Sequence, residues 1–177
     1  MTMTLVEAAY DFAQKAHEGQ TRKYTGAPYF THPVEVAKIV KGVSHTPEMI
    51  AAALLHDVCE DCGIHLAIIG EKFGLRVRYL VDMLTDPEGL KGNRAARKAQ
   101  IRERWRLAPP NADDARTIKL ADTISNSSTI FDRDPNFAKV YGPEMVALLP
   151  CLKGGDPTLY HMAEHQLKIK MENLLNG

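Results

Sequence analysis

One short segment constrains the fold of this chain more than any other. Residues 50–55 read Ile-Ala-Ala-Ala-Leu-Leu, so a helix built from them is apolar on every side. Such a helix has no face for water and must be buried among other elements. Thr46-Pro47-Glu48 precedes it with a capping hydroxyl, a proline suited to the first helical position and an acid in the first turn. The pattern predicts a buried helix over residues 46–61.

Helical periodicity also dominates the rest of the chain, and no alternating run typical of β-strands stands out. Apolar residues three and four apart predict a helix over residues 4–18, whereas Gly26 and Pro28 mark residues 19–31 as a loop. Further helices are expected at residues 33–41, 64–73, 75–84, 93–107, 113–131, 137–149 and 157–175. We therefore predict an all-α fold in which residues 1–177 form one domain.

Charge and composition exclude several classes of protein. Lys and Arg together total 22, as do Asp and Glu, so no net positive charge favours a nucleic-acid partner. No apolar stretch approaches the roughly 20 residues of a membrane span, and the first residues lack a signal-peptide pattern. The odd number of cysteines (Cys59, Cys62 and Cys151) argues against a disulfide framework. We expect a soluble cytoplasmic protein with no membrane partner.

The apolar segment runs directly into charged residues. The next six residues are His56-Asp57-Val58-Cys59-Glu60-Asp61. On a continuous helix His56 and Glu60 share one face, and Asp57 and Asp61 share the adjoining face. Burying uncompensated charge is costly, so a divalent cation would neutralise these carboxylates. A solvated helix end with a few acids is the alternative, which the buried lead-in makes less favourable.

A second polar group lies in the expected helix over residues 113–131. Lys119, Asp122, Asn126 and Thr129 follow a spacing that places them on one helical face. Asp122 follows the apolar residues of this helix closely and is therefore a candidate buried carboxylate. An isolated Asp of this kind is more often a hydrogen-bonded structural residue.

A third polar element is the loop over residues 22–33, which carries two cations, an aromatic pair and His32 just before a helix. With His56, Asp57 and Asp122, His32 makes a set of two imidazoles and two carboxylates. This mixed nitrogen and oxygen set suits Mn²⁺, Fe²⁺, Co²⁺ or Zn²⁺. It leaves room for coordinated water, as a catalytic site requires.

Three sequence blocks together resemble a known family. They are Arg22-Lys23 with Gly26-x-Pro28-Tyr29-x-x-His32-Pro33, then Ala53-x-Leu55-His56-Asp57-x-x-Glu60-Asp61, and then Lys119-Leu120-Ala121-Asp122-x-x-x-Asn126. With these blocks the chain resembles the HD phosphohydrolase superfamily, and within it the hydrolase domain of RelA/SpoT-type proteins, over roughly residues 5–135. Helices over residues 137–175 would complete an HD-domain helical bundle. Since 177 residues leave no room for the synthetase and regulatory parts of long members, the resemblance implies a stand-alone alarmone hydrolase of the metazoan SpoT type.

The resemblance also implies a reaction and a role for each site residue. It implies metal-dependent hydrolysis of the 3′-pyrophosphate of (p)ppGpp-type nucleotides to GDP or GTP and pyrophosphate. It implies one Mn²⁺ per chain, with Fe²⁺, Co²⁺ or Zn²⁺ as alternatives, held by His32, His56, Asp57 and Asp122. The remaining roles are Glu60 and Asp61 beside the attacking water, Arg22 and Lys23 on the nucleotide, and Asn126 and Thr129 in its pocket.

The chain departs from its relatives in places that bear on the substrate. Residues 123–125 (Thr-Ile-Ser) and residues 127–128 (Ser-Ser) stand where relatives often carry Arg-Leu-His and Met-Arg, and residues 86–104 match poorly. A related HD enzyme acting on (p)ppApp or NADPH therefore stays open. A non-catalytic nucleotide-binding module is a further alternative, although such a module would have no need of Glu60 and Asp61.

Two other patterns have simpler explanations. His161-x-x-Glu164-His165 matches an inverted zinc-peptidase motif, but only 12 residues follow it and they offer no obvious third ligand. The basic stretch over residues 94–106 contains Trp105 and resembles a nucleic-acid-binding segment. In a chain without net charge, a solvated helix face is the more common explanation.

Overall fold

The computed structural model of the chain describes residues 3–176, and its regular structure is helical. Within these residues there is no β-strand, only an isolated bridge between Thr21 and Pro28. The all-α prediction is therefore confirmed. The helices form two compact units, one ending at Asp86 and the other beginning at Pro87. The grouping of residues 1–177 into one domain stays a prediction.

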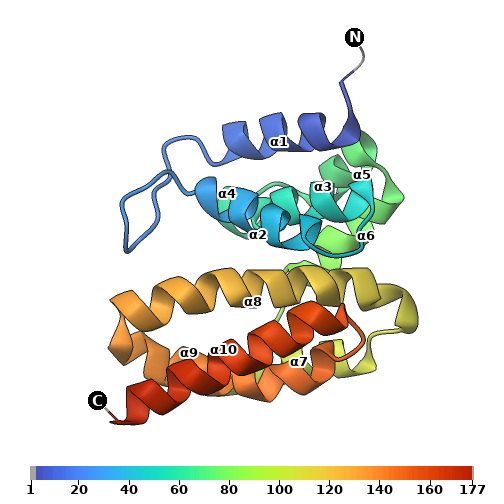
Figure 1. Cartoon of the computed structure of the whole chain (residues 1–177). Helices are drawn as coiled ribbons and strands as arrows, with labels where there is room; N and C mark the ends of the chain where they lie inside the picture. Colours follow the sequence, from blue (N-terminus) through green and yellow to red (C-terminus); the bar gives the residue numbers. More distant parts are fainter. Residues whose placement is uncertain (1–2, 177) are drawn as a thin grey trace. The chain divides into compact units, whose positions relative to one another are not determined.

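The first unit is built around an apolar helix. Its helices are α1 (Leu5–Ala16), α2 (Thr31–Lys41), α3 (Pro47–Leu55), α4 (Val58–Cys62), α5 (Leu66–Phe73) and α6 (Leu75–Leu84) (Figure 1). α3 packs against α1, α2 and α6, and every residue from Met49 to Leu55 is buried. As predicted, the Thr46 hydroxyl accepts a hydrogen bond from the Met49 amide at 3.2 Å, and Pro47 opens the helix. The end of α3 is thus fixed inside the core.

The prediction of one continuous helix over residues 46–61 is wrong. The structure places a turn at His56 and Asp57, between α3 and α4. The His56 ring Nδ1 lies 2.8 Å from the carbonyl oxygen of Ala53, which a continuing helix would offer to the amide of Asp57. Because of this turn, His56 and Glu60 do not share the face of a single helix. The two halves of the H-D-x-x-E-D motif lie on separate elements.

The second unit consists of longer helices. They are α7 (Arg94–Leu107), α8 (Asp113–Arg133), α9 (Pro135–Leu148) and α10 (Pro157–Asn176), with short 3₁₀ turns at Pro110–Ala112 and Leu149–Leu152 (Figure 1). α8 packs against α9 and α10 and buries Ile118, Leu120 and Ile124. The four helices predicted here are confirmed to within two residues at each end.

A buried arginine holds the start of α8. Arg116 donates hydrogen bonds to the carbonyl oxygens of Ala108 at 2.6 Å and Cys151 at 3.2 Å, and to Asp113 at 2.5 Å. A guanidinium carries five N–H donors, so one side chain can satisfy several carbonyls at once. The segments on both sides of α8 are thereby tied to the helix that carries Asp122.

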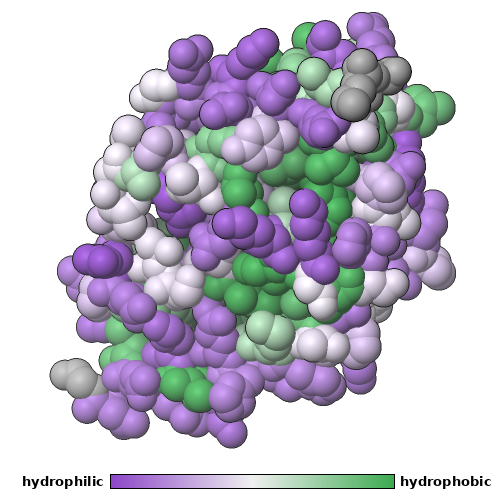
Figure 2. Space-filling model, turned by 45° about the horizontal axis from the view of Figure 1, so that its top comes forward, coloured by the Kyte–Doolittle hydropathy of each residue, from purple (hydrophilic) through white to green (hydrophobic). Residues whose placement is uncertain are grey.

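Both hydrophilic and hydrophobic residues reach the surface on the face drawn in Figure 2. Across residues 3–176, the structure contains no helix of the length and apolar character that crossing a bilayer demands.

Candidate metal centre

Three of the predicted ligands meet in the first unit. His32, His56 and Asp57 each present one ligand atom, and these atoms lie within 4.8 Å of one another. His56 Nε2 is 3.1 Å from Asp57 Oδ1, and His32 Nε2 is 3.7 Å from Asp57 Oδ2. The two imidazoles are almost fully buried, with 3 % and 4 % of their surface exposed. We call these three residues the ligand cluster.

The backbone sets the tautomer of His56. Because its Nδ1 faces the Ala53 carbonyl oxygen at 2.8 Å, that nitrogen carries a proton and donates it. In the neutral ring, Nε2 is then an acceptor that lies 3.1 Å from a carboxylate oxygen. Two acceptors this close require a proton or a cation beside them. The donor set of two imidazole nitrogens and a carboxylate therefore fits a divalent transition-metal ion.

His32 owes its position to the loop before α2. Arg22 N donates to Ala27 O at 2.8 Å, and Gly26 closes this turn with φ at +68°, a conformation that glycine adopts without strain. The helix begins at Thr31, so His32 lies inside its first turn instead of just before it as predicted. The loop and the first turn of α2 together deliver His32 to the ligand cluster.

Tyr29 joins the same loop to the ligand cluster. Its hydroxyl donates a hydrogen bond to Asp57 Oδ2 at 2.7 Å. Burial raises the pKa of this phenol far above its ordinary value, and the negative charge of Asp57 adds to the effect. Tyr29 is therefore a permanent donor to Asp57 in the working pH range.

The structure separates the two acids predicted to act on water. Asp61 interacts with Tyr29 and so lies beside the ligand cluster. Glu60 instead accepts a hydrogen bond from the backbone amide of Asp86, beyond the end of α6. Both lie on α4, but the contacts connect Asp61 more directly to Asp57. Their shared catalytic role stays a prediction.

Asp122 belongs to the second unit, where it is 6 % exposed. Lys119 Nζ donates to its Oδ2 at 2.8 Å, and Asn126 Nδ2 donates to its Oδ1 at 2.6 Å. These three residues lie on one face of α8, as their spacing predicts, with Thr129 half-buried further along the helix. Asp122 is thus a charged, buried carboxylate held by two donors. Its assignment as a fourth ligand stays a prediction from the sequence.

Comparison with known proteins now decides the family. The HD-domain family profile matches residues 9–144. The chain belongs to the HD-domain family. HD domains hold a divalent metal, and the ligand cluster is a candidate His and Asp site for such an ion.

Relatives and solved structures agree with this assignment. The chain is 33 % identical over 168 residues to a guanosine-3′,5′-bis(diphosphate) 3′-pyrophosphohydrolase of Vibrio cholerae, covering 94 % of the chain and 23 % of the relative. The same values hold for the bifunctional (p)ppGpp synthase/hydrolase SpoT of Escherichia coli. A solved metazoan ortholog of SpoT superposes with a TM-score of 0.83 at 24 % identity, over 96 % of this chain and 97 % of that one. The resemblance to SpoT-type hydrolases is confirmed, and the chain spans about a quarter of the curated relatives' length.

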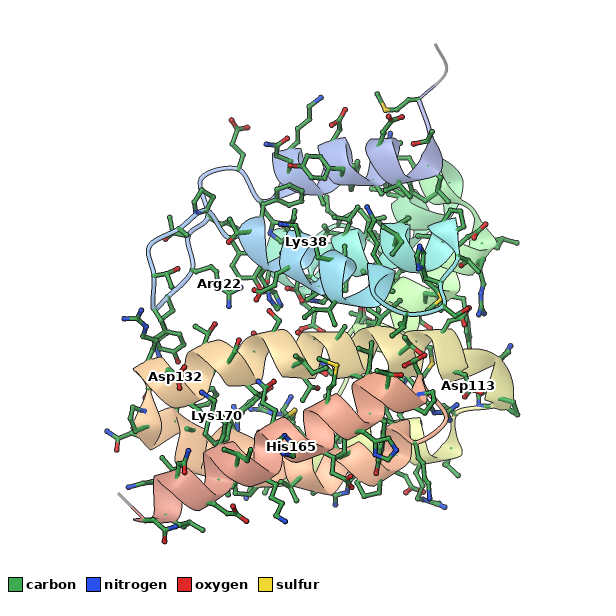
Figure 3. All side chains as sticks on the ribbon, in the orientation of Figure 1. Arg22, Lys38, Asp113, Asp132, His165 and Lys170 are labelled. Atoms are coloured by element: carbon green, nitrogen blue, oxygen red, sulfur yellow. The ribbon has the colours of Figure 1, made fainter. Side chains whose placement is uncertain are left out.

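The predicted nucleotide contacts of this HD domain lie on the loop before α2. Arg22 is half-buried there (Figure 3). Lys23 is exposed, and its ammonium lies 4.9 Å from the centre of the Tyr24 ring. A cation on an aromatic face gains a modest electrostatic attraction. The loop therefore presents two cations in the unit that holds the ligand cluster. Their contact with a nucleotide stays a prediction, as does the pocket role of Asn126 and Thr129.

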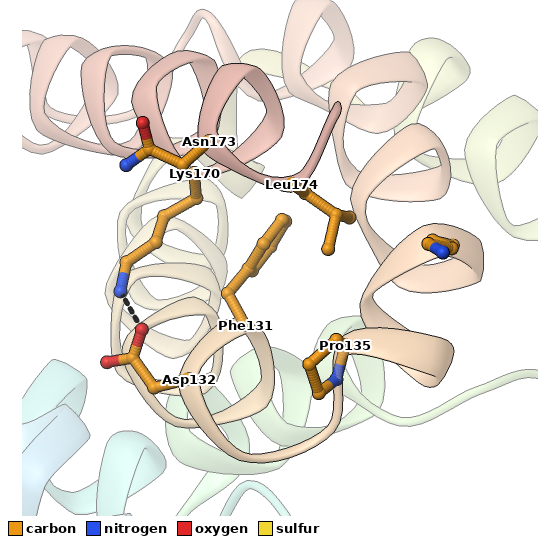
Figure 4. A pocket seen from close by; sticks show the side chains of 7 residues that line it. Phe131, Asp132, Pro135, Lys170, Asn173 and Leu174 are labelled. Carbon is orange, nitrogen blue, oxygen red and sulfur yellow. Dashed lines mark hydrogen bonds and ion pairs between the residues drawn. The ribbon is translucent and has the colours of Figure 1, made fainter. Parts of the chain in front are cut away.

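A separate hollow of about 490 Å³ lies in the second unit (Figure 4). Its wall includes the ion pair between Lys170 and Asp132, together with the Phe131 ring. None of the residues predicted for metal, water or nucleotide lines it. This hollow is not the site that the sequence motifs mark.

The inverted zinc-peptidase motif and the basic stretch over residues 94–106 do not contribute to the ligand cluster. His161 and Glu164 have 76 % and 55 % of their side chains exposed, and His165 is exposed on the same helix, α10 (Figure 3). Within residues 3–176, the ligand cluster is the one group of at least three His, Cys, Asp or Glu side chains placed to share an ion. Trp105 is 2 % exposed and belongs to the core, which supports a solvated basic face for α7. All three cysteines are free, as expected.

Sequence reasoning missed two residues beside the ligand cluster. His17 follows α1 and is 2 % exposed, and its Nδ1 lies 2.8 Å from Gln20 Oε1. Gln20 Nε2 in turn donates to the backbone oxygen of Asp61 at 3.0 Å. The available signal was a polar pair three residues apart at the end of the first helix. Nothing in that spacing connects it with the backbone of Asp61, which follows Gln20 by 41 residues.

Proposed function

We propose that this HD domain hydrolyses the 3′-diphosphate ester of (p)ppGpp-type nucleotides with a bound Mn²⁺. The observation that carries the proposal is the buried ligand cluster of His32, His56 and Asp57, with Asp61 linked to it through Tyr29. Relatives that are 33 % identical carry the names of enzymes of this reaction, which supports the choice of substrate.

His32, His56 and Asp57 would hold the ion, and we assign Asp122 as the fourth ligand on its sequence motif. Mn²⁺ suits this mixed nitrogen and oxygen set, which Fe²⁺, Co²⁺ and Zn²⁺ also tolerate. When bound, such a cation lowers the pKa of water and neutralises charge on phosphate oxygens. The Ala53 carbonyl keeps the Nε2 lone pair of His56 directed toward the ligand cluster.

The carboxylates of α4 supply the base. Asp61, and with it Glu60, accepts the proton of the attacking water as its oxygen bonds to the phosphorus next to the ribose 3′ oxygen. The bond between that phosphorus and the 3′ oxygen breaks, so pyrophosphate leaves and the ribose oxygen takes up a proton. The products are pyrophosphate and GDP or GTP. The electrostatic interaction of Asp61 with Tyr29, which helps to raise the pKa of the phenol, makes Asp61 the stronger candidate for the base.

Cations outside the ligand cluster would bind the rest of the substrate. The nucleotide carries two groups of phosphates, so charge beyond that of one ion is needed at its binding site. The planar guanidinium of Arg22 can stack on a base or pair with a phosphate, and Lys23 offers a point charge. Asn126 and Thr129 would line the pocket.

The deciding experiment compares substrates on purified protein loaded with Mn²⁺. ppGpp, pppGpp, ppApp and NADPH are incubated separately, and the products are separated by chromatography. We expect guanine alarmones to release pyrophosphate, and the Asp57→Ala variant to release none. Orthophosphate from NADPH without pyrophosphate from ppGpp would refute the proposal. A tenfold higher kcat/KM for ppApp, about 1.4 kcal/mol of transition-state binding, would change the base preference and keep the reaction class.

A further inference from the structure

Three side chains outside the ligand cluster connect the two ends of α4. Tyr29 contacts Asp57 before the helix, and Gln20 contacts Asp61 within it. His17 lies between them, since its ring is 4.9 Å from the Tyr29 ring and its Nδ1 is 2.8 Å from Gln20. We call His17, Gln20 and Tyr29 the outer frame. All three residues belong to the first unit.

Tyr29 restrains the carboxylate of Asp57. The Tyr29 hydroxyl donates a hydrogen bond to Oδ2 at 2.7 Å, and Oδ1 lies 3.1 Å from His56 Nε2. With one oxygen held by a half-buried donor, the carboxylate plane loses rotational freedom. The Tyr29 ring is itself held between His17 at 4.9 Å and His32 at 6.1 Å. The direction in which Asp57 presents Oδ1 to His56 therefore depends on one phenol.

Gln20 and His17 restrain the backbone of Asp61. The Gln20 amide nitrogen donates to the Asp61 carbonyl at 3.0 Å, so its Oε1 is the acceptor that faces His17. His17 Nδ1 must then carry the proton, and the Cys62 sulfur lies 3.3 Å from the same nitrogen. His17 itself is 2 % exposed, so its end of this chain of contacts is buried. It fixes the backbone from which the Asp61 carboxylate extends.

We propose that the outer frame is a set of positioning residues, in which Tyr29 orients the metal ligand Asp57 while His17 and Gln20 hold Asp61 in place for water activation. The hydrolytic part rests on the proposed function. The metal part does not, because it can be measured without any nucleotide.

The first test removes one oxygen atom. Tyr29→Phe keeps the ring and its packing on His17 but takes the hydrogen bond from Asp57. Losing a group that orients a metal ligand commonly costs about 10- to 100-fold in metal affinity, and we expect a rise of that size in the Kd for Mn²⁺ measured by calorimetry. Tyr10→Phe is the matched control, because Tyr10 is 40 % exposed, packs on Phe30 and belongs neither to the ligand cluster nor to the outer frame. Its Kd should equal that of the wild type.

The second test separates metal binding from rate. Gln20→Met keeps the length of the side chain but cannot donate to Asp61 O. Since Asp61 is not a ligand, we expect the Kd for Mn²⁺ and the KM to stay unchanged while kcat falls about tenfold or more, because small misplacements of a catalytic group are costly. His17→Phe keeps a ring against Tyr29 and removes the partner of Gln20. Like Gln20→Met, it should lower kcat and leave KM unchanged.

The outcomes distinguish the two proposals. If the wild type leaves ppGpp intact while Tyr29→Phe still weakens Mn²⁺ binding, the proposed function fails and the orienting role of Tyr29 stands. If Tyr29→Phe binds Mn²⁺ with the wild-type Kd, and Gln20→Met turns over at the wild-type kcat, the outer frame only supports the fold and the proposal is overturned. Thermal unfolding of each variant shows whether the fold is kept.

Discussion

Replacing Asp57 by alanine gives two separable effects on stability, one without metal and one with it. Without metal, the variant leaves the half-buried Tyr29 hydroxyl without the acceptor that lies 2.7 Å away. A hydrogen bond to a charged partner contributes about 1.5–3 kcal/mol, so the free energy of unfolding should fall by about that amount. This loss reflects only the contacts of the carboxylate within the protein.

With metal, the difference should widen. A cation present at about a hundredfold its Kd stabilises the wild type by about 2.7 kcal/mol, provided that the unfolded chain does not bind it. For a chain of 177 residues this corresponds to a rise in Tm of about 5–11 °C. Asp57→Ala removes one of the three clustered ligands, and we expect it to show no rise.

Scanning calorimetry with and without Mn²⁺ measures both effects, and elemental analysis gives the metal content of each protein. His161→Ala is the matched control, because this exposed histidine belongs to the inverted zinc-peptidase motif on α10, outside the ligand cluster. It should keep the full rise in Tm. An equal rise in the Asp57→Ala protein would show that the ion binds elsewhere and would refute the assignment of the ligand cluster.

Three further predictions concern single residues. Asp61→Asn should keep the metal and lose about a hundredfold or more in kcat, and equal rates in this variant and the wild type would exclude Asp61 as the base. Glu60→Gln should lose less activity, because the Glu60 carboxylate accepts a hydrogen bond from the Asp86 amide. Arg22→Ala should raise the KM for ppGpp, whereas Lys38→Ala, which removes an exposed cation from α2 (Figure 3), should leave it unchanged. The same KM in both variants would contradict the assignment of Arg22 to nucleotide binding. Burial raises the pKa of the Cys59 thiol from 9.0 to about 11. Its contribution to the free energy of unfolding should therefore be present below pH 9 and be lost between about pH 9 and 11. Its alkylation in mild alkali, followed by mass spectrometry, should be about a hundredfold slower than in denaturant, and similar rates would show an exposed thiolate.

The sequence determined features that depend on neighbouring residues. The all-apolar residues 50–55 have no solvent face, and all of them are buried in the structure. Thr46 and Pro47 specify a helix start through local hydrogen bonding and a preset φ angle, and the helix begins there. The spacing of Lys119, Asp122 and Asn126 specified a shared face, because helical periodicity is a local property.

Only the tertiary structure decided how the carboxylates are arranged. A four-residue spacing between His56 and Glu60 predicts a shared face only on an unbroken helix, and the turn at His56 and Asp57 breaks it. The hydrogen bond from Tyr29 to Asp57 spans 28 positions, and that from Gln20 to Asp61 spans 41. Such contacts follow from how α1, α2 and α3 pack around a common core, which periodicity and motifs do not encode. The sequence by itself therefore determined which residue types form the site, whereas packing decided which of them support one another.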